Sequence, residues 1–544
     1  MIMISSLMTR VARRFLLEFD VLRWKKAVRH LTRQNQTSNS RQKTFLVCDL
    51  LAMIGGVKTE VLFSWGMALQ GYKPVVLLNH AEPILEKLYR AVLVNVEFVY
   101  FDTYCRKVDQ VTQNRKVEAL LKEYHGHVHG LLSFEVDGIR VGKNALSLAI
   151  RKLRVGKIDL SDPHHFNEVR NAFSYSMTAA VAAQKLILDI QPERALFNER
   201  GYTPAGEVFD ACILSGCDAI QWIGAPREDE LMFKRYNLSN RSVHPLSLSD
   251  EVWEQVSKGG RGEHVESIVL ARIFNNYDEG AAYNRQKLQD GKKLVSRDEV
   301  IQNLSIDPSK KTAVIFTHIL YDATFFYGES LFEDYQHWLI ETVRSAIKNS
   351  ALNWVIKVHP VNVWRSKMDD MPMEQLEVVA LRNEFGELPD HIRIMPADTQ
   401  INTGSLFDVI DYALTVRGTI GMELPCLGIP VVTAGSGRYS GHGFTIDPQN
   451  VHEFSEQLAT LHMVPPLTPV QKKAAQQYYF ATMFLRPTAF SSFDIDYEAY
   501  SYGLKDLAVD CTVVPKVDWG QDLKKLSAWI SSDSSQDFLT ISEQ

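Results

Sequence analysis

Short apolar runs that end in polar or glycine-bearing turns alternate along the chain with segments of helical periodicity. In the first example, the apolar run KTFLVCDLL, which ends at Leu51, is followed by Gly55-Gly56, a helical pattern over residues 57–69 and an apolar run over residues 74–78. This order of strand, turn, helix and strand is typical of parallel sheets covered by helices. We therefore predict an α/β fold built from Rossmann-like units.

The same order recurs between Leu406 and Gly437, with more polar residues at the turn. An apolar strand runs into Gly418 and Thr419, a helix that carries Glu423 follows, and a second strand ends at Thr433. Parallel α/β sheets bind ligands outside the carboxyl ends of their strands, and the N–H groups at a helix start suit a phosphate. We expect this turn to contact the phosphate of a nucleotide sugar, and Glu423 to face its ribose or sugar.

Two neighbouring strand ends in the second half carry further polar residues, namely Thr317, His318, Asp322, Lys357 and His359. Successive carboxyl ends line one edge of a parallel sheet, so we expect these residues to share one crevice with Thr419. A departing nucleotide phosphate needs cations and hydrogen-bond donors, which Lys357 and His359 supply. Asp322 is expected to position the substrate.

The first half of the chain offers carboxylates at or near strand ends, where the base of an inverting sugar transfer would lie. The candidates are Glu199, Glu135, Asp137 and Asp49, with Glu199 ranked first. The Gly55-Gly56 pair follows the first strand. It either approaches the substrate closely or forms a tight turn, and the sequence leaves both interpretations open.

With 544 residues the chain exceeds one hydrophobic core, so two or three domains are expected. The polar composition of residues 226–309 marks the region between them. We predict two Rossmann-like domains that face a central cleft, preceded by an amphipathic helix and followed by a helical tail. The predicted parts are a basic segment and linker (1–43), an acceptor domain (44–290), a nucleotide-sugar donor domain (291–465) and the tail (466–544).

Residues 1–43 contain ten basic residues and two acidic ones, with apolar residues at helical spacing. Such a basic amphipathic helix can lie on an anionic membrane surface, or it can pack on the protein's own surface with its charges in water. No apolar run reaches the ~18–20 residues of a membrane span, and arginines interrupt the apolar stretch that a secretion signal needs. We expect a cytoplasmic protein, with a peripheral place on the inner face of the membrane as an option.

The formal net charge of −6 argues against a general nucleic-acid binder, which would show a basic field. The six cysteines are scattered and form no CxxC pair, so we expect reduced thiols rather than disulfides or a metal site. The histidines at 125, 127, 129, 164 and 165 are read as solvated side chains. We predict no metal and no cofactor beyond the nucleotide-sugar co-substrate.

Several ordered motifs between about residues 44 and 460 resemble the bacterial capsule polysaccharide biosynthesis proteins, whose C-terminal halves resemble GT-B glycosyltransferases. In the second half they are IFTHILYDATFFYG, WLIETVRSAI, VIKVHP, the run from TQINTGSLF to PVVTAG, and GFTIDP. In the first half they are DGIRVG and NERGYTPAGEVFDACILSGCDAIQW. His359-Pro360 is also similar to the His-Pro motif of bacterial sialyltransferases and Kdo transferases, in which the histidine contacts the nucleotide phosphate.

The resemblance implies a glycosyltransferase that uses a nucleotide-sugar donor and a polysaccharide or lipid-linked glycan acceptor to build capsule or lipopolysaccharide. It implies that His359 contacts the donor phosphate and that Thr419 and Glu423 contact the donor nucleotide. The Asp/Glu-Asp/Glu-Gly motif of those enzymes has only a loose counterpart at residues 135–138, which leaves the base open. Three alternatives stay open: a CDP-polyol phosphotransferase, a non-catalytic GT-B-like scaffold and a nucleotide-sugar 2-epimerase.

Overall fold

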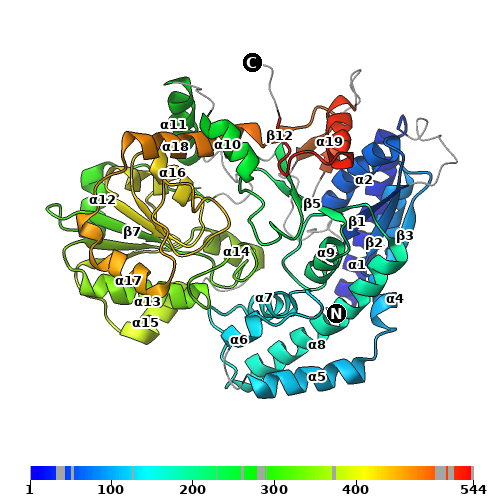
Figure 1. The fold of residues 1–544 in the computed structure, drawn as a ribbon, viewed down its shortest axis with the longest axis horizontal. Helices are drawn as coiled ribbons and strands as arrows, with labels where there is room; N and C mark the ends of the chain where they lie inside the picture. The colour runs from blue at the N-terminus through cyan, green and yellow to red at the C-terminus, as the bar shows by residue number, and fades with distance from the viewer. Residues whose placement is uncertain are drawn as a thin grey trace.

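Two separate sheets, each built around parallel strands and covered by helices, form the protein (Figure 1). The α/β fold with two Rossmann-like units that the sequence predicted is confirmed. The computed structural model describes residues 2–31, 43–50, 54–124, 128–227, 230–258, 263–278, 288–289, 291–369, 375–496, 510–512 and 520–540. Among these residues, no helix is long and apolar enough to span a bilayer.

The first sheet has seven strands in the order β12-β6-β5-β4-β1-β2-β3, and β1 to β5 pair in parallel. Its strands are β1 (Lys43–Asp49), β2 (Tyr72–Leu78), β3 (Glu97–Tyr100), β4 (Arg194–Phe197), β5 (Asp218–Gly224), β6 (Glu230–Tyr236) and β12 (Thr488–Ala489). Alternate side chains of β1 enter two different cores, Leu46 and Cys48 on one face and Phe45 and Val47 on the other. This alternation is why the strand reads as one continuous apolar run.

Helices cover both faces of this sheet. They are α2 (Ile54–Leu69), α3 (Pro83–Arg90), α4 (Phe101–Cys105), α5 (Gln110–Glu123), α6 (Val128–Leu132), α7 (Val141–Leu153), α8 (Pro163–Ile190) and α9 (Ala205–Leu214). Gly55 and Gly56 therefore lie in the first turn of α2, and not in a loop before it, as the sequence suggested. The helix pattern predicted from residue 57 begins three residues earlier at Ile54.

The second sheet is parallel throughout, with the order β11-β10-β7-β8-β9. Its strands are β7 (Thr312–Phe316), β8 (Asn353–Lys357), β9 (Ile392–Met395), β10 (Tyr412–Thr415) and β11 (Val431–Thr433). The helices around it are α12 (Arg297–Leu304), α13 (Tyr335–Lys348), α14 (Val361–Asp369), α15 (Leu376–Phe385), α16 (Ile420–Cys426), α17 (Val451–Ala459) and a 3-10 helix (Thr403–Asp408). The strands match those that the sequence predicted to within two residues at each described end.

The polar region between the sheets contains a strand that the sequence did not predict. β6 pairs antiparallel with β5 and widens the first sheet. Helices α10 (Asp250–Lys258) and α11 (Glu263–Asp278) follow it and pack against the second domain, together with α18 (Pro469–Phe480). The hydrophobic pattern of β6 is weak in the sequence because the strand contains a buried lysine. Lys234 is 1% exposed, and its Nζ lies 2.7 Å from Oδ1 of Asp537, which is far along the chain.

The C-terminal tail returns to the first domain, so it is not only helical. After α18 and a π-helical turn (Ala481–Leu485), β12 pairs antiparallel with β6, and α19 (Gln521–Ser531) packs against α2. Two short strands, β13 (Asp494–Asp496) and β14 (Asp510–Thr512), pair with each other. Within the predicted tail the sequence also favours a helix over residues 497–509, which lie outside the described residues. The bounds of the four predicted parts stay predictions.

The two passages of the chain between the domains are bound to each other by Arg486, which is 0% exposed. Its guanidinium donates to the carbonyl oxygens of Pro245 and Ser247 at 2.7 and 2.9 Å and to that of Phe233 at 3.0 Å. Residues 245–247 lie on the outward passage and Arg486 on the return. The crossings therefore lie side by side at one edge of the molecule.

A loop of the second domain, residues 322–329, also reaches into the first domain. Phe325 belongs to the core on one face of the first sheet, and the ring of Phe326 packs edge-on against Tyr202. The Tyr327 hydroxyl accepts a hydrogen bond from Gln221 Nε2 at 3.2 Å. Gly328 follows, and its φ of +100° is a backbone conformation that glycine adopts more readily than other residues.

The N-terminal helix α1 (Ile2–Ala27) packs its second half on the first domain. Val21 and Trp24 are each 2% exposed and join the core between the sheet and α2. Trp24 Nε1 donates to the carbonyl oxygen of Leu88 at 3.1 Å. Asp20 also pairs with Lys58 of α2, with Oδ1 and Nζ 2.8 Å apart. For this half of the helix, the structure agrees with the interpretation that α1 packs on the protein's own surface.

Candidate functional site

The carboxyl ends of β7 and β8 bring together three residues singled out in the sequence. Thr317 N donates to the carbonyl oxygen of Lys357 at 3.1 Å, and Thr317 Oγ1 accepts from His359 N at 3.1 Å. His359 Nδ1 accepts from the backbone N–H of Val361 at 3.2 Å, so the ring proton of a neutral His359 is on Nε2. His359 therefore presents a donor at the edge of the sheet.

His318 was expected in the same crevice, but its ring is bonded into the sheet. Its Nε2 accepts from the backbone N–H of Val416 at 3.1 Å and lies 3.1 Å from Thr415 Oγ1. The ring stacks on Tyr335 with centroids 4.5 Å apart. Burial lowers the pKa of His318 well below its usual value, and the neighbouring Arg417 lowers it further. The neutral ring joins β7 to β10.

Lys357 is also more buried than the sequence suggested, at 2% exposed. Its Nζ donates to the carbonyl oxygen of Val358 at 3.0 Å. Burial, followed by the charge of Lys292, lowers the pKa of Lys357 to about 7. A lysine that is about half neutral at pH 7 is a weaker partner for a phosphate than a fully charged lysine.

The turn between β10 and α16 holds the remaining donor candidates. Gly418 N donates to Thr415 Oγ1 at 3.1 Å, and Thr419 precedes the first residue of α16 with its side chain half-buried. Glu423, one turn further on, is 6% exposed and accepts a hydrogen bond from the Tyr277 hydroxyl at 2.6 Å. Burial raises the pKa of Glu423. Its contact with a ribose stays a prediction.

Two arginines beside this turn were missed in the sequence. Arg417 and Arg438 are 5% and 9% exposed. Arg417 Nη2 donates to the carbonyl oxygen of Glu329 at 3.2 Å, and Arg438 Nη1 donates to the carbonyl oxygen of Arg417 at 3.0 Å. Nε and Nη1 of Arg417, and Nε and Nη2 of Arg438, have no hydrogen-bond partner among the described residues. Because an unpaired buried donor costs roughly 1–3 kcal/mol, more when it is charged, these N–H groups indicate a place for an anion.

The surroundings of both arginines are positive. His244, from the first domain, donates its backbone N–H to the carbonyl oxygen of Gly437 at 2.7 Å and is half-buried. Burial lowers the pKa of His244 well below its usual value, and the charges of Arg438 and Arg417 lower it further. The charges of the same two arginines also lower the pKa of His318. An anion that bound here would meet the charges of both arginines where the two domains touch, with the carboxyl of Glu423 as an acidic neighbour of Arg438.

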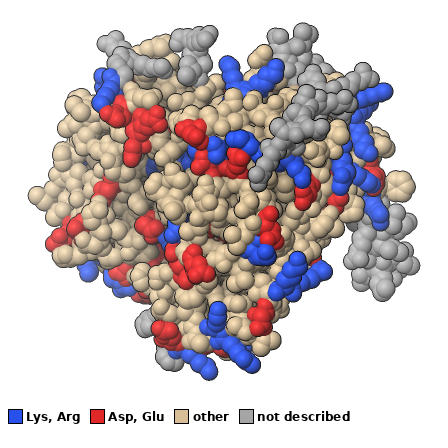
Figure 2. Space-filling model, turned by 45° about the vertical axis from the view of Figure 1, so that its right-hand side comes forward, with Lys and Arg blue, Asp and Glu red and all other residues tan. Residues whose placement is uncertain are grey.

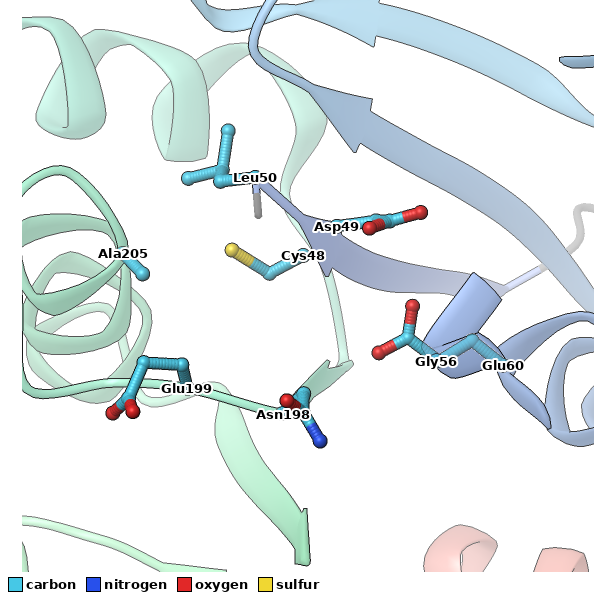
Figure 3. A pocket seen from close by; sticks show the side chains of 8 residues that line it. All are labelled: Cys48, Asp49, Leu50, Gly56, Glu60, Asn198, Glu199 and Ala205. Carbon is cyan, nitrogen blue, oxygen red and sulfur yellow. The ribbon is translucent and has the colours of Figure 1, made fainter. Parts of the chain in front are cut away.

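In the first domain, a small cavity lies at the carboxyl ends of β1 and β4 (Figure 3). It is lined by Cys48, Asp49, Leu50, Gly56, Glu60, Asn198, Glu199 and Ala205. Its volume of about 20 Å³ holds about one water molecule. In Figure 3, Asp49 and Glu60 lie on one side of β1, Cys48 points to the other, and Glu199 comes from the segment after β4.

Two of the predicted catalytic candidates line this cavity, Asp49 and the first-ranked Glu199. Glu199 Oε1 accepts from the backbone N–H groups of Arg200 and Gly201 at 2.7 and 3.0 Å. Burial raises its pKa although these bonds oppose the change. A carboxyl group whose pKa is raised toward neutrality is suited to take up and release a proton. Gly56, from the predicted Gly-Gly pair, lies in the same lining.

Glu60 of α2 was not singled out in the sequence because it lies in the middle of an apolar helix. It is 2% exposed, and its Oε1 accepts a hydrogen bond from Trp222 Nε1 at 3.0 Å. Burial raises its pKa well above the usual value, and the charge of Asp49 adds to the shift. The raised pKa favours the neutral form of Glu60, which lies beside a second acid.

The structure does not bring Glu135 and Asp137 to the cavity. Both lie on an exposed turn between α6 and α7. Glu135 pairs with Arg241 at 3.0 Å, and Asp137, with φ of +50°, accepts from Gln184 Nε2 at 3.2 Å. The loose Asp/Glu-Asp/Glu-Gly counterpart is thus a turn on the outside of the first domain.

Asp322 lies between the domains. Its Oδ1 accepts a hydrogen bond from the Tyr202 hydroxyl at 2.9 Å and lies 3.8 Å from Arg151 Nη1. These contacts connect the second domain to the loop that follows Glu199. Its role in positioning a substrate stays a prediction. Across the described parts of the chain, no group of three or more His, Cys, Asp or Glu side chains is arranged as metal ligands.

No family model and no curated protein matches the sequence. Among solved structures, the chain is similar to KpsC, a beta Kdo 2,4 transferase of Thermosulfurimonas dismutans (12% identity, 54% of this chain and 81% of that chain, TM-score 0.32). It is also similar to a glycosyltransferase from Rickettsia africae (8%, 82% and 95%, 0.24) and to UDP-GlcNAc 2-epimerase from Neisseria meningitidis bound to UDP-GlcNAc (11%, 80% and 96%, 0.27). Similarity at this level carries no information on substrate or activity.

Proposed function

We propose that this protein is a glycosyltransferase that transfers a sugar from a nucleotide-sugar donor to a growing bacterial surface polysaccharide. The observation that carries the proposal is the pair of buried arginines, Arg417 and Arg438, whose unpaired N–H groups lie next to the turn at Thr419. The phosphate groups of a nucleotide sugar supply the missing acceptors. The motif resemblance to capsule polysaccharide biosynthesis proteins supports the polysaccharide product.

In the proposed mechanism, the second domain binds the donor and the first binds the acceptor. Arg417, Arg438 and His359 Nε2 stabilise the negative charge that develops on the leaving nucleotide phosphate. Glu199, at the cavity of the first domain, takes the proton from the acceptor hydroxyl. Because that cavity holds about one water molecule, the first domain or the loop at Phe326 moves aside before an acceptor enters.

The donor site is tested by thermal unfolding of the full chain with UMP, UDP, GDP, CMP and CDP-linked ligands. A ligand that binds the folded state at a hundredfold excess over its Kd stabilises it by ~2.7 kcal/mol, so Tm rises by a few degrees. We expect at least one nucleotide to do so, and Arg417→Met and Arg438→Met to abolish the rise. Each substitution also removes the bonds that Arg417 donates to Glu329 and Ser330 or that Arg438 donates to Arg417. The nucleotide shift of each variant is therefore measured against its own ligand-free Tm.

Arg344→Gln is the matched control, because this arginine contacts Glu341, Glu384 and the ring of Phe385 on the surface, away from the turn at Thr419. It should keep the full nucleotide shift. If the folded wild-type protein shows no shift with any of these ligands, the donor site does not exist. A product that carries a phosphodiester in place of a glycosidic link would instead identify a polyol phosphotransferase.

A further inference from the structure

The N-terminal helix α1 has an apolar stripe on the side turned away from the protein. Phe15, Phe19 and Leu22 are 77%, 60% and 63% exposed. Their spacing of four and three residues places them on one face of the helix. The opposite face, with Val21 and Trp24, is the one buried in the first domain.

Such a cluster is not repeated in the described parts of the chain. The other large apolar side chains that are exposed lie one to an element or loop: Val94, Val111, Leu188, Leu214, Leu238, Phe274, Leu294, Val451, Met463 and Val470. Single exposed apolar residues are ordinary on soluble proteins, whereas a contiguous group marks an interaction surface.

Basic side chains surround the stripe. Arg14, Arg23, Lys25, Lys26 and Arg29 are all exposed. The two acidic residues of this half of α1 are directed to the domain, since Glu18 pairs with Lys87 and Asp20 pairs with Lys58. On the face drawn in Figure 2, by contrast, acidic side chains lie among most of the basic ones. The solvent side of α1 is therefore apolar and positively charged in a chain whose net charge is −6.

We propose that α1 docks the protein on an anionic phospholipid bilayer, with Phe15, Phe19 and Leu22 inserted between the headgroups and the surrounding cations on lipid phosphates. An apolar stripe flanked by Lys and Arg on a helix parallel to the surface is the arrangement that binds such membranes. A second copy of the chain is a poorer occupant, because two such faces would bring their positive charges together. This inference is independent of the proposed donor site.

The packing of α1 makes this surface directional. Trp24 and the Asp20–Lys58 ion pair fix the helix to the first domain. A membrane bound to the outer face of α1 thus holds the first domain, and with it the proposed acceptor side, in one orientation to the bilayer. A flexible basic tail would not fix the orientation of the first domain to the bilayer.

The test is co-sedimentation of the full-length protein with unilamellar vesicles. One set is phosphatidylcholine alone and the other is three parts phosphatidylcholine to one part phosphatidylglycerol. We expect at least tenfold tighter binding to the anionic vesicles, weakened by salt. Phe15→Glu with Phe19→Glu should reduce this binding at least tenfold, and so should Lys25→Glu with Lys26→Glu. Val470→Glu, at a 78% exposed apolar residue on α18, should bind like the wild type.

Equal partition of the wild type with both vesicle sets would overturn the proposal. So would wild-type binding by the folded Phe15/Phe19 variant, with folding checked by an unchanged Tm. If that variant fails to fold, the Lys25/Lys26 variant decides in its place. Self-association without vesicles that the Phe15/Phe19 substitutions abolish would assign the stripe to a contact between copies of this chain. Nucleotide binding should be the same in all variants, so failure here is distinguishable from failure of the donor site.

Discussion

Glu207 is a buried acid on α9 whose protonation couples folding to pH. Its Oε1 accepts hydrogen bonds from the hydroxyls of Ser176 and Thr203, while its Oε2 has no partner among the described residues. Burial raises its pKa from 4.5 to about 7. The folded state therefore favours the neutral acid, whereas the unfolded chain ionises near pH 4.5.

This raised pKa predicts a loss of stability as the pH rises. The contribution of Glu207 is fully present below pH 4.5 and is lost by about pH 7, which amounts to roughly 3 kcal/mol. Glu207→Gln removes it, so the difference in unfolding free energy between variant and wild type should grow by about that amount between pH 4.5 and pH 7.5. Urea unfolding at several pH values measures it. A constant difference over this range would contradict the raised pKa.

At the same scale, the sequence located part of the site and missed the rest. A strand end fixes where the backbone of His318, Lys357 and His359 lies, and those positions were predicted correctly. It does not fix which contacts a side chain makes, so the sequence could not show that His318 and Lys357 are held inside the sheet. Arg417 and Arg438 were missed because what singles them out is unpaired donors, and only the packing reveals those.

At the scale of elements, the seating of α1 depends on a buried ion pair with α2. Lys58 is 2% exposed, and the Asp20 carboxylate that it meets is 12% exposed. Removing one partner of a buried pair leaves an uncompensated charge, which costs about 3–5 kcal/mol. Arg23 Nη2 also lies 3.5 Å from Asp20 Oδ1 and still compensates part of its charge, so Lys58→Met should destabilise the protein by at most roughly 3 kcal/mol in chemical unfolding.

The double variant Asp20→Asn with Lys58→Met is the matched control, because it removes both charges. It should recover most of the lost stability. If the single and double variants are equally unstable, the loss comes from packing of the lysine stem against Trp24 and not from the charge.

The elements that the sequence missed are those whose stabilising partners are far along the chain. β6 carries Lys234 and Arg235 in its buried part, and these are neutralised by Asp537 and Asp218. The sequence around β6 does not reveal these ion pairs. Helix α19 lies in the tail that the sequence predicted to be helical, but its packing against α2 was not predicted. Strands β7 to β10 were predicted because each forms its own apolar run between turns.

At the scale of the molecule, the contact between the domains depends on a glycine. A Cβ at Gly328 would lie 2.0 Å from the carbonyl oxygen of Ser436, and its φ is +100°. Gly441 has a similar φ of +87° but nothing within 4 Å. Gly441→Ala thus carries only the backbone cost of about 1 kcal/mol, whereas Gly328→Ala adds a collision.

We expect Gly328→Ala to lower the unfolding free energy by about 1–3 kcal/mol more than Gly441→Ala, as measured by chemical unfolding. The same substitution should increase proteolysis of the 322–329 loop, because its contacts with Tyr202 and Gln221 loosen. Equal effects of the two substitutions would mean that the loop moves away from Ser436 at no cost.

The paired crossings at Arg486 have a mechanical consequence. The second domain is inserted into the first and is attached at two points, and Arg486 binds these points to each other through Pro245 and Ser247. Two attachments held together act as one hinge, so the second domain can swing only about a line through this edge. Opening the crevice about this hinge would break the contacts of the 322–329 loop with Tyr202 and Gln221, while the bonds at Arg486 stay in place.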